Sequence, residues 1–181
     1  MSSGDTLNPA ERLRLLQDEY LVPGAGQRAE RVSKSTEPGT PIRLAVFDHM
    51  RESVGEVVAL AASMRENQAP STAPPAKADS IYRWLVEETD HLDAARQQAR
   101  DVVIYRQGLE HAIVMGDSKV IRRHSCPNCV TWGLIWDRVH EEVVCLNRHC
   151  ADDDGQHTTW TLKQLAEDHI ARRNNRAARA T

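Results

Sequence analysis

Aromatic side chains are scarce in this chain of 181 residues: they make up 4% of it, as one Phe, three Tyr and four Trp. Its cores must therefore be built mainly from aliphatic side chains, with tryptophan as the main large apolar residue. Long apolar runs are also lacking, and no segment has the pattern of a signal peptide or of a membrane span. We therefore expect an intracellular, cytoplasmic protein that does not bind a membrane.

Common enzyme motifs are missing as well. The sequence contains no glycine-rich phosphate loop, no nucleophile elbow and no His-Glu-x-x-His motif. A zinc deaminase would need a His-x-Glu motif before its Pro-Cys-x-x-Cys, and this is absent. The acidic residues Glu87, Glu88, Asp90 and Asp93 lack a repeated Glu-x-x-His partner motif and are interpreted as a solvated helix face. The sequence thus predicts a protein that is not an enzyme and takes no small-molecule substrate.

The net charge of −3 argues against a protein that coats nucleic acid through overall charge, but it allows a local basic surface. Such a surface lies near the C-terminus, where no acidic residue follows Asp168. On a helix, Arg172, Arg176 and Arg179 fall on one face beside Arg173, and could meet successive phosphates or an acidic protein groove. The alternative is a solvated tail whose arginines favour the helix C-terminus electrostatically. Both interpretations remain open.

All the cysteines of the chain lie within one short segment, as Cys126, Cys129, Cys145 and Cys150. The gap within the first pair is two residues and within the second pair four, and both gaps are typical of structural zinc sites. The spacing predicts one Zn²⁺ ion held by four thiolates. Because four protein ligands leave a tetrahedral metal no open position, the ion is expected to stabilise the fold and not to catalyse.

Other uses of these cysteines remain open. An iron–sulfur cluster takes the same ligands, and a Cys-x-x-Cys pair can also carry redox chemistry. A disulfide framework is disfavoured in a reducing compartment. His124, His149 and His157 flank the cysteines, and one of them could replace a thiolate. We expect instead surface histidines beside a complete set of four thiolates.

The residues between the two cysteine pairs have the pattern of a β-hairpin. Trp132, Leu134 and Trp136 alternate with smaller or polar residues, residues 137–142 supply a turn, and Val143 and Val144 return toward the second pair. A further short strand at residues 158–160 would complete a three-stranded sheet.

Helices are predicted on both sides of this hairpin. Asn8 and Glu11 form a capping box for a short helix, and Thr40 with Pro41 begins a long one. The apolar stripe of the long helix consists of Phe47, Met50, Val54, Val57, Val58, Ala61 and Met64.

Two more helices precede the hairpin, and one follows it. Asp79 is expected to cap a helix that carries Trp84 as a core anchor, and a helical pattern follows over residues 95–113. Thr161 and Gln164 match a second capping box, which begins the terminal helix.

The Cys-Pro-Asn-Cys knuckle, the hairpin with its central tryptophan, the second knuckle and the Trp160-x-Leu162 sequence resemble the zinc-ribbon superfamily. More loosely, residues 41–170 resemble small, uncharacterised helical-plus-zinc-ribbon proteins of actinobacteria and their phages, through the segments 41–48 and 81–85. The resemblance implies a helical domain before a ribbon. Several of these relatives carry a helix-turn-helix after the ribbon and are labelled DNA-binding, whereas a single helix follows the ribbon here.

These patterns predict an α+β protein with an N-terminal α-helical bundle of about three main helices. A small four-cysteine zinc ribbon with a three-stranded sheet and a C-terminal helix follow. The expected divisions are a partly ordered helix and linker (1–39), the helical bundle (40–118), the ribbon (119–162) and a C-terminal helix with a basic tail (163–181).

Two functional hypotheses follow. The first is a non-catalytic, zinc-stabilised nucleic-acid-binding or transcription-associated module, of actinobacterial or phage origin, that contacts DNA or the transcription machinery. Its candidate contact residues are Trp132, Trp136, Arg138, Arg172, Arg173, Arg176 and Arg179. The second is an interaction or assembly protein, such as a phage adaptor or virion component, whose helical region binds a protein partner or a second copy of the chain. The sequence leaves the partner, any DNA specificity and the oligomeric state open.

Overall fold

The structure is a computed structural model that describes residues 8–21, 41–65, 72–151, 155 and 157–180. It confirms the α+β class, with helices and one three-stranded antiparallel sheet. The predicted linker at 22–39 lies outside the described residues. Contacts divide the chain into two compact units, Met1–Glu88 and Thr89–Thr181.

The first unit begins with α1 (Pro9–Leu15) and a π-helical turn, η1 (Leu16–Leu21). The predicted capping box is present: the Glu11 amide donates to Asn8 Oδ1, and the Asn8 amide donates to Glu11 Oε2, both at 2.9 Å. These bonds satisfy two donors that a helix start leaves without partners. Leu13 and Leu16 are fully buried and anchor the helix.

Helix α2 (Pro41–Met64) follows the predicted long helix, and its buried face is close to the predicted stripe. Met50, Val57, Ala61 and Met64 are buried. Phe47 is 48% exposed, so its assignment to that stripe was wrong. The buried face instead continues from Met50 to Val46, four residues earlier and therefore on the same side of the helix.

Helix α3 (Ile81–Thr89) follows a 3₁₀ turn, η2 (Ala78–Ser80). The prediction that Asp79 caps this helix was wrong, because Asp79 lies inside the 3₁₀ turn that precedes the helix. The N-cap residue of that turn is Lys77, which makes no side-chain capping hydrogen bond. Trp84 is buried, as expected, and its Nε1 donates to Thr72 Oγ1 at 2.9 Å.

Glu88 of α3 is also buried, which contradicts the predicted solvated acidic face at this position. Its carboxylate accepts hydrogen bonds from Arg65 Nη1 at 2.5 Å, Thr72 N at 3.0 Å and Thr72 Oγ1 at 2.7 Å. These three donors replace the water that a buried carboxylate loses. Glu87, Asp90 and Asp93 are exposed, as expected.

The second unit consists of α4 (Ala94–Val114), the 3₁₀ helix η3 (Ser118–Arg123), β1 (Leu134–Asp137), β2 (Glu142–Cys145), β3 (Thr159–Trp160) and α5 (Leu162–Ala180). The strands pair antiparallel in the order β1-β2-β3, with Leu134 opposite Cys145 and Val143 opposite Trp160. The predicted hairpin and third strand are thereby confirmed. Gln164 and Thr161 form the second capping box at the start of α5.

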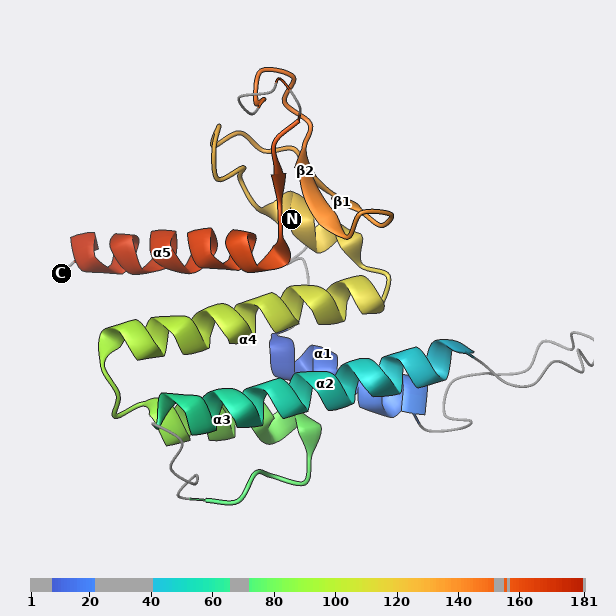
Figure 1. Cartoon of the computed structure of the whole chain (residues 1–181), viewed down its shortest axis with the longest axis vertical. Coiled ribbons are helices and arrows are strands. Elements are labelled where there is room, and N and C mark those ends of the chain that lie inside the picture. Colours follow the sequence, from blue (N-terminus) through green and yellow to red (C-terminus); the bar gives the residue numbers. More distant parts are fainter. Residues whose placement is uncertain (1–7, 22–40, 66–71, 152–154, 156, 181) are drawn as a thin grey trace, which may run out of the picture. The chain divides into compact units, whose positions relative to one another are not determined.

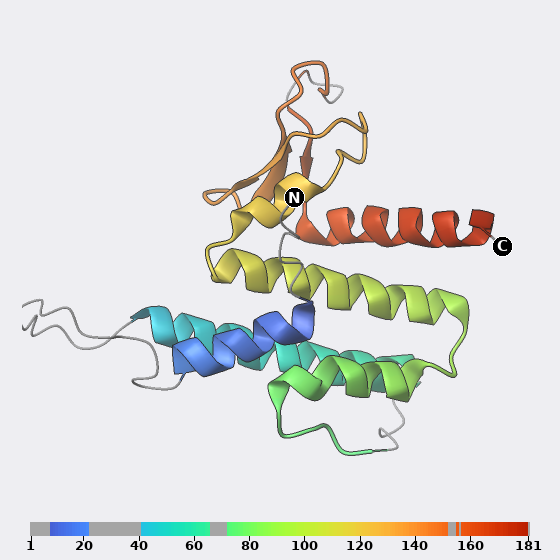
Figure 2. The same cartoon turned by 180° about the vertical axis from the view of Figure 1, so that it is seen from behind.

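Helices α4 and α5 lie side by side and antiparallel, with the sheet at the end where α5 begins (Figures 1 and 2). Tyr105 of α4 stacks on His169 of α5, and Arg173 of α5 pairs with Asp101 one turn earlier in α4. Val102, Ala166 and Ile170 fill the space between the helices.

One core joins α4 and α5 to the cysteine-bearing segment. It consists of Leu109, Ala112, Val120, Ile121, Cys126, Leu134, Val143, Cys145, Cys150 and Leu165. The division between the two compact units therefore falls inside the predicted bundle of residues 40–118, and α4 belongs to the unit that contains the sheet.

Candidate metal centre and adjacent basic pocket

The four cysteine sulfurs come together in the second unit, and all lie within 4.8 Å of one another. Cys126 Sγ is 3.7 Å from Cys150 Sγ, and Cys129 Sγ is 3.7 Å from Cys145 Sγ. With metal–sulfur bonds of about 2.3 Å, a tetrahedral ion holds its sulfurs about 3.8 Å apart. The four cysteines could therefore hold one metal ion, as their spacing predicts.

A tight turn after η3 positions the first pair. The Val130 amide donates to the Cys126 carbonyl and the Cys126 amide donates to the Thr131 carbonyl, both at 2.9 Å. This turn places Val130 at φ 61°, in the left-handed region. A β-branched residue is strained there, and the Val130 side chain is 60% exposed, so no buried contact offsets the strain.

Hydrogen bonds and burial give the sulfurs different acidities. The Thr131 hydroxyl, 3.0 Å from Cys129 Sγ, lowers the pKa of Cys129 to about 5. Burial raises the pKa of Cys145 to about 12 and also raises the pKa of Cys126. At neutral pH Cys129 is therefore largely a thiolate, the form that binds metals, whereas a metal ion would have to displace protons from the two buried thiols.

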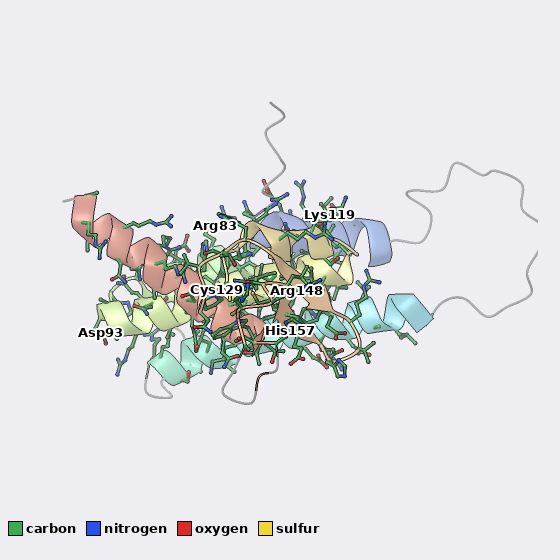
Figure 3. The ribbon with its side chains drawn as sticks, turned by 90° about the horizontal axis from the view of Figure 1, so that it is seen from above. Arg83, Asp93, Lys119, Cys129, Arg148 and His157 are labelled. Carbon is green, nitrogen blue, oxygen red and sulfur yellow. The ribbon has the colours of Figure 1, made fainter. Side chains whose placement is uncertain are left out.

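The neighbouring histidines are not part of this cluster. His149 and His157 are exposed, as expected, and His157 is labelled with Cys129 in Figure 3. His124 is buried, so the expectation of a surface position was wrong for it. Its Nε2 lies 2.6 Å from the Tyr105 hydroxyl, and its Nδ1 lies 3.1 Å from the Val120 carbonyl oxygen. Burial lowers the pKa of His124, so the neutral ring donates from Nδ1 and accepts at Nε2.

A pocket of about 270 Å³ lies beside the first cysteine pair. Arg123, His124, Ser125 and Trp132 line it from one side, and α5 contributes Asp168, His169, Arg172, Arg173 and Arg176. Four arginines thus face one carboxylate, which makes this part of an acidic protein locally basic.

Arg172 connects α5 to the first cysteine pair. Its Nη1 donates to Ser125 Oγ at 2.9 Å, its Nη2 to the Pro127 carbonyl at 3.3 Å, and its Nε to Asp168 Oδ1 at 2.9 Å. With its guanidinium engaged on three sides, Arg172 holds the pocket together and offers little to a ligand.

The other predicted arginines lie in different settings. Arg173 pairs with Asp101 but stays half exposed. Arg176 is exposed and forms no hydrogen bond or ion pair with any residue that the structure describes. Arg179 is exposed one turn further along α5 and does not line the pocket.

The predicted contact residues of the hairpin also lie in different environments. Trp132 is 71% exposed and lines the pocket just before β1. Trp136 packs against the core, and Arg138 is exposed in the turn between β1 and β2. The structure therefore brings Trp132 together with Arg172, Arg173 and Arg176, and leaves Trp136, Arg138 and Arg179 outside this pocket.

Arg123 and His169 are among the lining residues that the sequence did not predict as contacts. The ring of His169 stacks on Tyr105, with ring centroids 4.1 Å apart and planes 4° from parallel. Burial, followed by the nearby His124 and Arg173, lowers the pKa of His169. His169 precedes Arg172 by three residues and Arg176 by seven, so helical periodicity could have placed it on their face. No comparable local signal marks Arg123.

No protein-family model, curated protein or solved structure matches this chain. None of the helices in the described part of the chain is both long enough and apolar enough to cross a membrane.

Proposed function

We propose that the protein is a non-catalytic nucleic-acid-binding module whose second unit is stabilised by one Zn²⁺ ion on Cys126, Cys129, Cys145 and Cys150. The sulfur separations of 3.7 Å support a single ion, because a cluster of several iron and sulfide atoms would push the sulfurs further apart. Four thiolates complete a tetrahedral shell, so the ion has a structural role.

The observation that carries nucleic-acid binding is the basic pocket with the exposed indole of Trp132. Arginine side chains bind phosphate through charge-assisted hydrogen bonds, and tryptophan stacks on nucleic-acid bases. Arg176 supplies a guanidinium that no described residue engages, next to an indole that is mostly exposed. This combination favours a ligand with both phosphates and aromatic faces.

Fluorescence anisotropy with labelled oligonucleotides tests the proposal on the zinc-loaded protein. Binding should weaken steeply as salt rises, since phosphate contacts release counterions. Arg176→Glu should reduce affinity about tenfold or more and lower the salt slope by about one. Arg179→Glu is the matched control, because it makes the same charge change on the same helix outside the pocket. An affinity that changes neither with salt concentration nor on Arg176→Glu would contradict the proposal.

One observation favours the alternative function, protein interaction or assembly. Leu44 and Phe47 of α2, three residues apart, are 67% and 48% exposed. Apolar side chains in this position could bind a second copy of the chain. Analytical sedimentation at micromolar concentration tests this alternative. A dimer that dissociates in the Leu44→Glu variant would support it, and a monomeric wild-type protein would count against it.

A further inference from the structure

The main chain that carries the indole of Trp132 is held in place, although the side chain is mostly exposed. Its backbone forms an isolated bridge with Ser125, and the preceding residue, Thr131, accepts a hydrogen bond from the Cys126 amide. The main chain on both sides of the indole is thus fixed by the metal-binding turn. An exposed aromatic ring on a rigid backbone binds a flat partner at a lower cost in conformational entropy.

Cationic groups from two elements line the same pocket. Arg176 and Arg173 come from α5 at a spacing of three residues, and Arg123 comes from the end of η3. The one carboxylate in the lining, Asp168, is occupied by Arg172. Arg176, which forms no hydrogen bond or ion pair with a described residue, therefore presents its positive charge to a ligand in the pocket.

The lining of the pocket also includes the flat ring of His169. Because it stacks on Tyr105, its orientation is set by α4 and not by a ligand. An uncharged imidazole can donate one hydrogen bond and accept another, which suits the polar edge of a base.

The shape of the pocket limits the kind of nucleic acid that fits. Its volume of about 270 Å³ is close to the lower end, about 300 Å³, of pockets that take small ligands. Duplex grooves are read by a helix or strand that projects into them, whereas this site is a concavity. In a duplex the base faces are covered by their neighbours, and only unpaired bases can stack on protein side chains.

We propose that this pocket binds one unpaired nucleotide of a single-stranded nucleic acid, with its base stacked on Trp132 and its phosphate at Arg176. The inference rests on the proposed nucleic-acid-binding function and narrows it to single strands. DNA and RNA share the chemistry required, and the experiment treats them as separate arms.

The test uses the full, zinc-loaded chain at low salt with three labelled probes of about 12 nucleotides, a length within the usual site sizes of single-strand binders. The probes are oligo(dT), oligo(rU) and a mixed-sequence DNA duplex. At least one single strand should bind about tenfold or more tightly than the duplex. Trp132→Ala should weaken that binding about 5- to 150-fold, the range for loss of one base-stacking contact, while Trp132→Phe retains most of it.

Two controls separate stacking from other effects. Val139→Ala changes an 84% exposed apolar residue away from the pocket and should leave affinity unchanged. An abasic strand of the same length keeps the phosphates and should bind about as weakly as oligo(dT) binds to Trp132→Ala. Far-UV circular dichroism and the zinc content of each variant show whether it remains folded.

The outcomes distinguish the single-strand site from nucleic-acid binding in general. Preference for either single strand with loss in Trp132→Ala supports the unpaired-nucleotide site. If the duplex binds as tightly as the single strands, or Trp132→Ala has no effect, the single-strand inference is overturned while nucleic-acid binding stands. If no probe binds at low salt, the nucleic-acid function itself is overturned.

Discussion

Arg172 and Ser125 are hydrogen-bonded although they lie 47 positions apart, and this bond joins α5 to the residue that precedes Cys126. Replacing Arg172 with Ala removes it together with the bonds to Pro127 and Asp168. We expect the free energy of unfolding of the zinc-loaded second unit to fall by about 1.5 kcal/mol, the usual size for hydrogen bonds to a charged group. Urea denaturation measures this change.

Arg179→Ala is the control for this prediction, because Arg179 is exposed on the same helix. Its effect should stay within about 0.5 kcal/mol, as for most surface substitutions. Equal stability of the two variants would show that Arg172 does not hold α5 to the turn that carries Cys126 and Cys129.

Removal of the metal should disrupt helices as well as the sheet. Three of the cysteines belong to the core that contains Leu109 of α4 and Leu165 of α5, so protonated, separated thiols would loosen all of it. Far-UV circular dichroism after treatment with a strong chelator should therefore show a marked loss of helical signal. Adding back Zn²⁺ should restore it, whereas Mg²⁺ should not, because Mg²⁺ prefers oxygen ligands. An unchanged helical signal in the metal-free protein would contradict the shared core.

Replacing Val130 with Gly should stabilise the protein. Glycine adopts a φ of 61° without steric strain, and the exposed valine side chain has little packing to lose. Glycine also has greater backbone freedom in the unfolded chain, which offsets part of this effect. We therefore expect the free energy of unfolding to rise by about 0.5 to 1 kcal/mol. Val139→Gly, at an exposed residue with ordinary backbone angles, should instead be neutral or slightly destabilising. Thermal unfolding of both variants checks this, and a lower melting temperature for Val130→Gly would refute the strain.

Glu88 should be important for the stability of the first unit. Glu88→Ala removes the ion-pair partner of Arg65 and the acceptor of the Thr72 amide. We expect the free energy of unfolding of the first unit to fall by about 3 kcal/mol. Glu88→Gln keeps an acceptor and should cost less. The adjacent, exposed Glu87→Ala should change stability by no more than about 0.5 kcal/mol. Hydrogen exchange of the α3 amides in the full chain reports the effect on this unit, and similar exchange in both alanine variants would count against it.

Features that depend on neighbouring residues were predictable from the sequence. The capping boxes at Asn8 and Thr161 each involve a partner three residues away, and the cysteine spacing carries the geometry of its own turns. Features that depend on distant partners were not. Glu88 carries a charge typical of the surface, and its burial depends on donors from Arg65 and Thr72, 23 and 16 positions earlier. Phe47 fits the helical stripe, but the direction in which α2 packs selects Val46 instead.

The same distinction applies to the candidate site. All four cysteines were identified from spacing alone. Trp132 and the arginines of α5 were identified as separate features, and their meeting depends on how α5 packs beside η3 and the metal-binding turn. Because no local pattern encodes that packing, Arg123 was missed and Trp136 was assigned to a surface when it packs against the core.

The position of the cysteine cluster between α4 and α5 also affects how the second unit folds. Asp101 and Arg173 must find each other across 72 positions, and the entropy lost in closing a flexible loop grows with its length. A metal ion that joins Cys126 to Cys150 gathers much of the intervening chain into a compact body before the helices meet. The helices are then connected by a shorter effective loop, which lowers the entropic barrier to their pairing and should speed folding. An ion bound by these cysteines would thus contribute to the rate of assembly as well as to the stability of the finished fold.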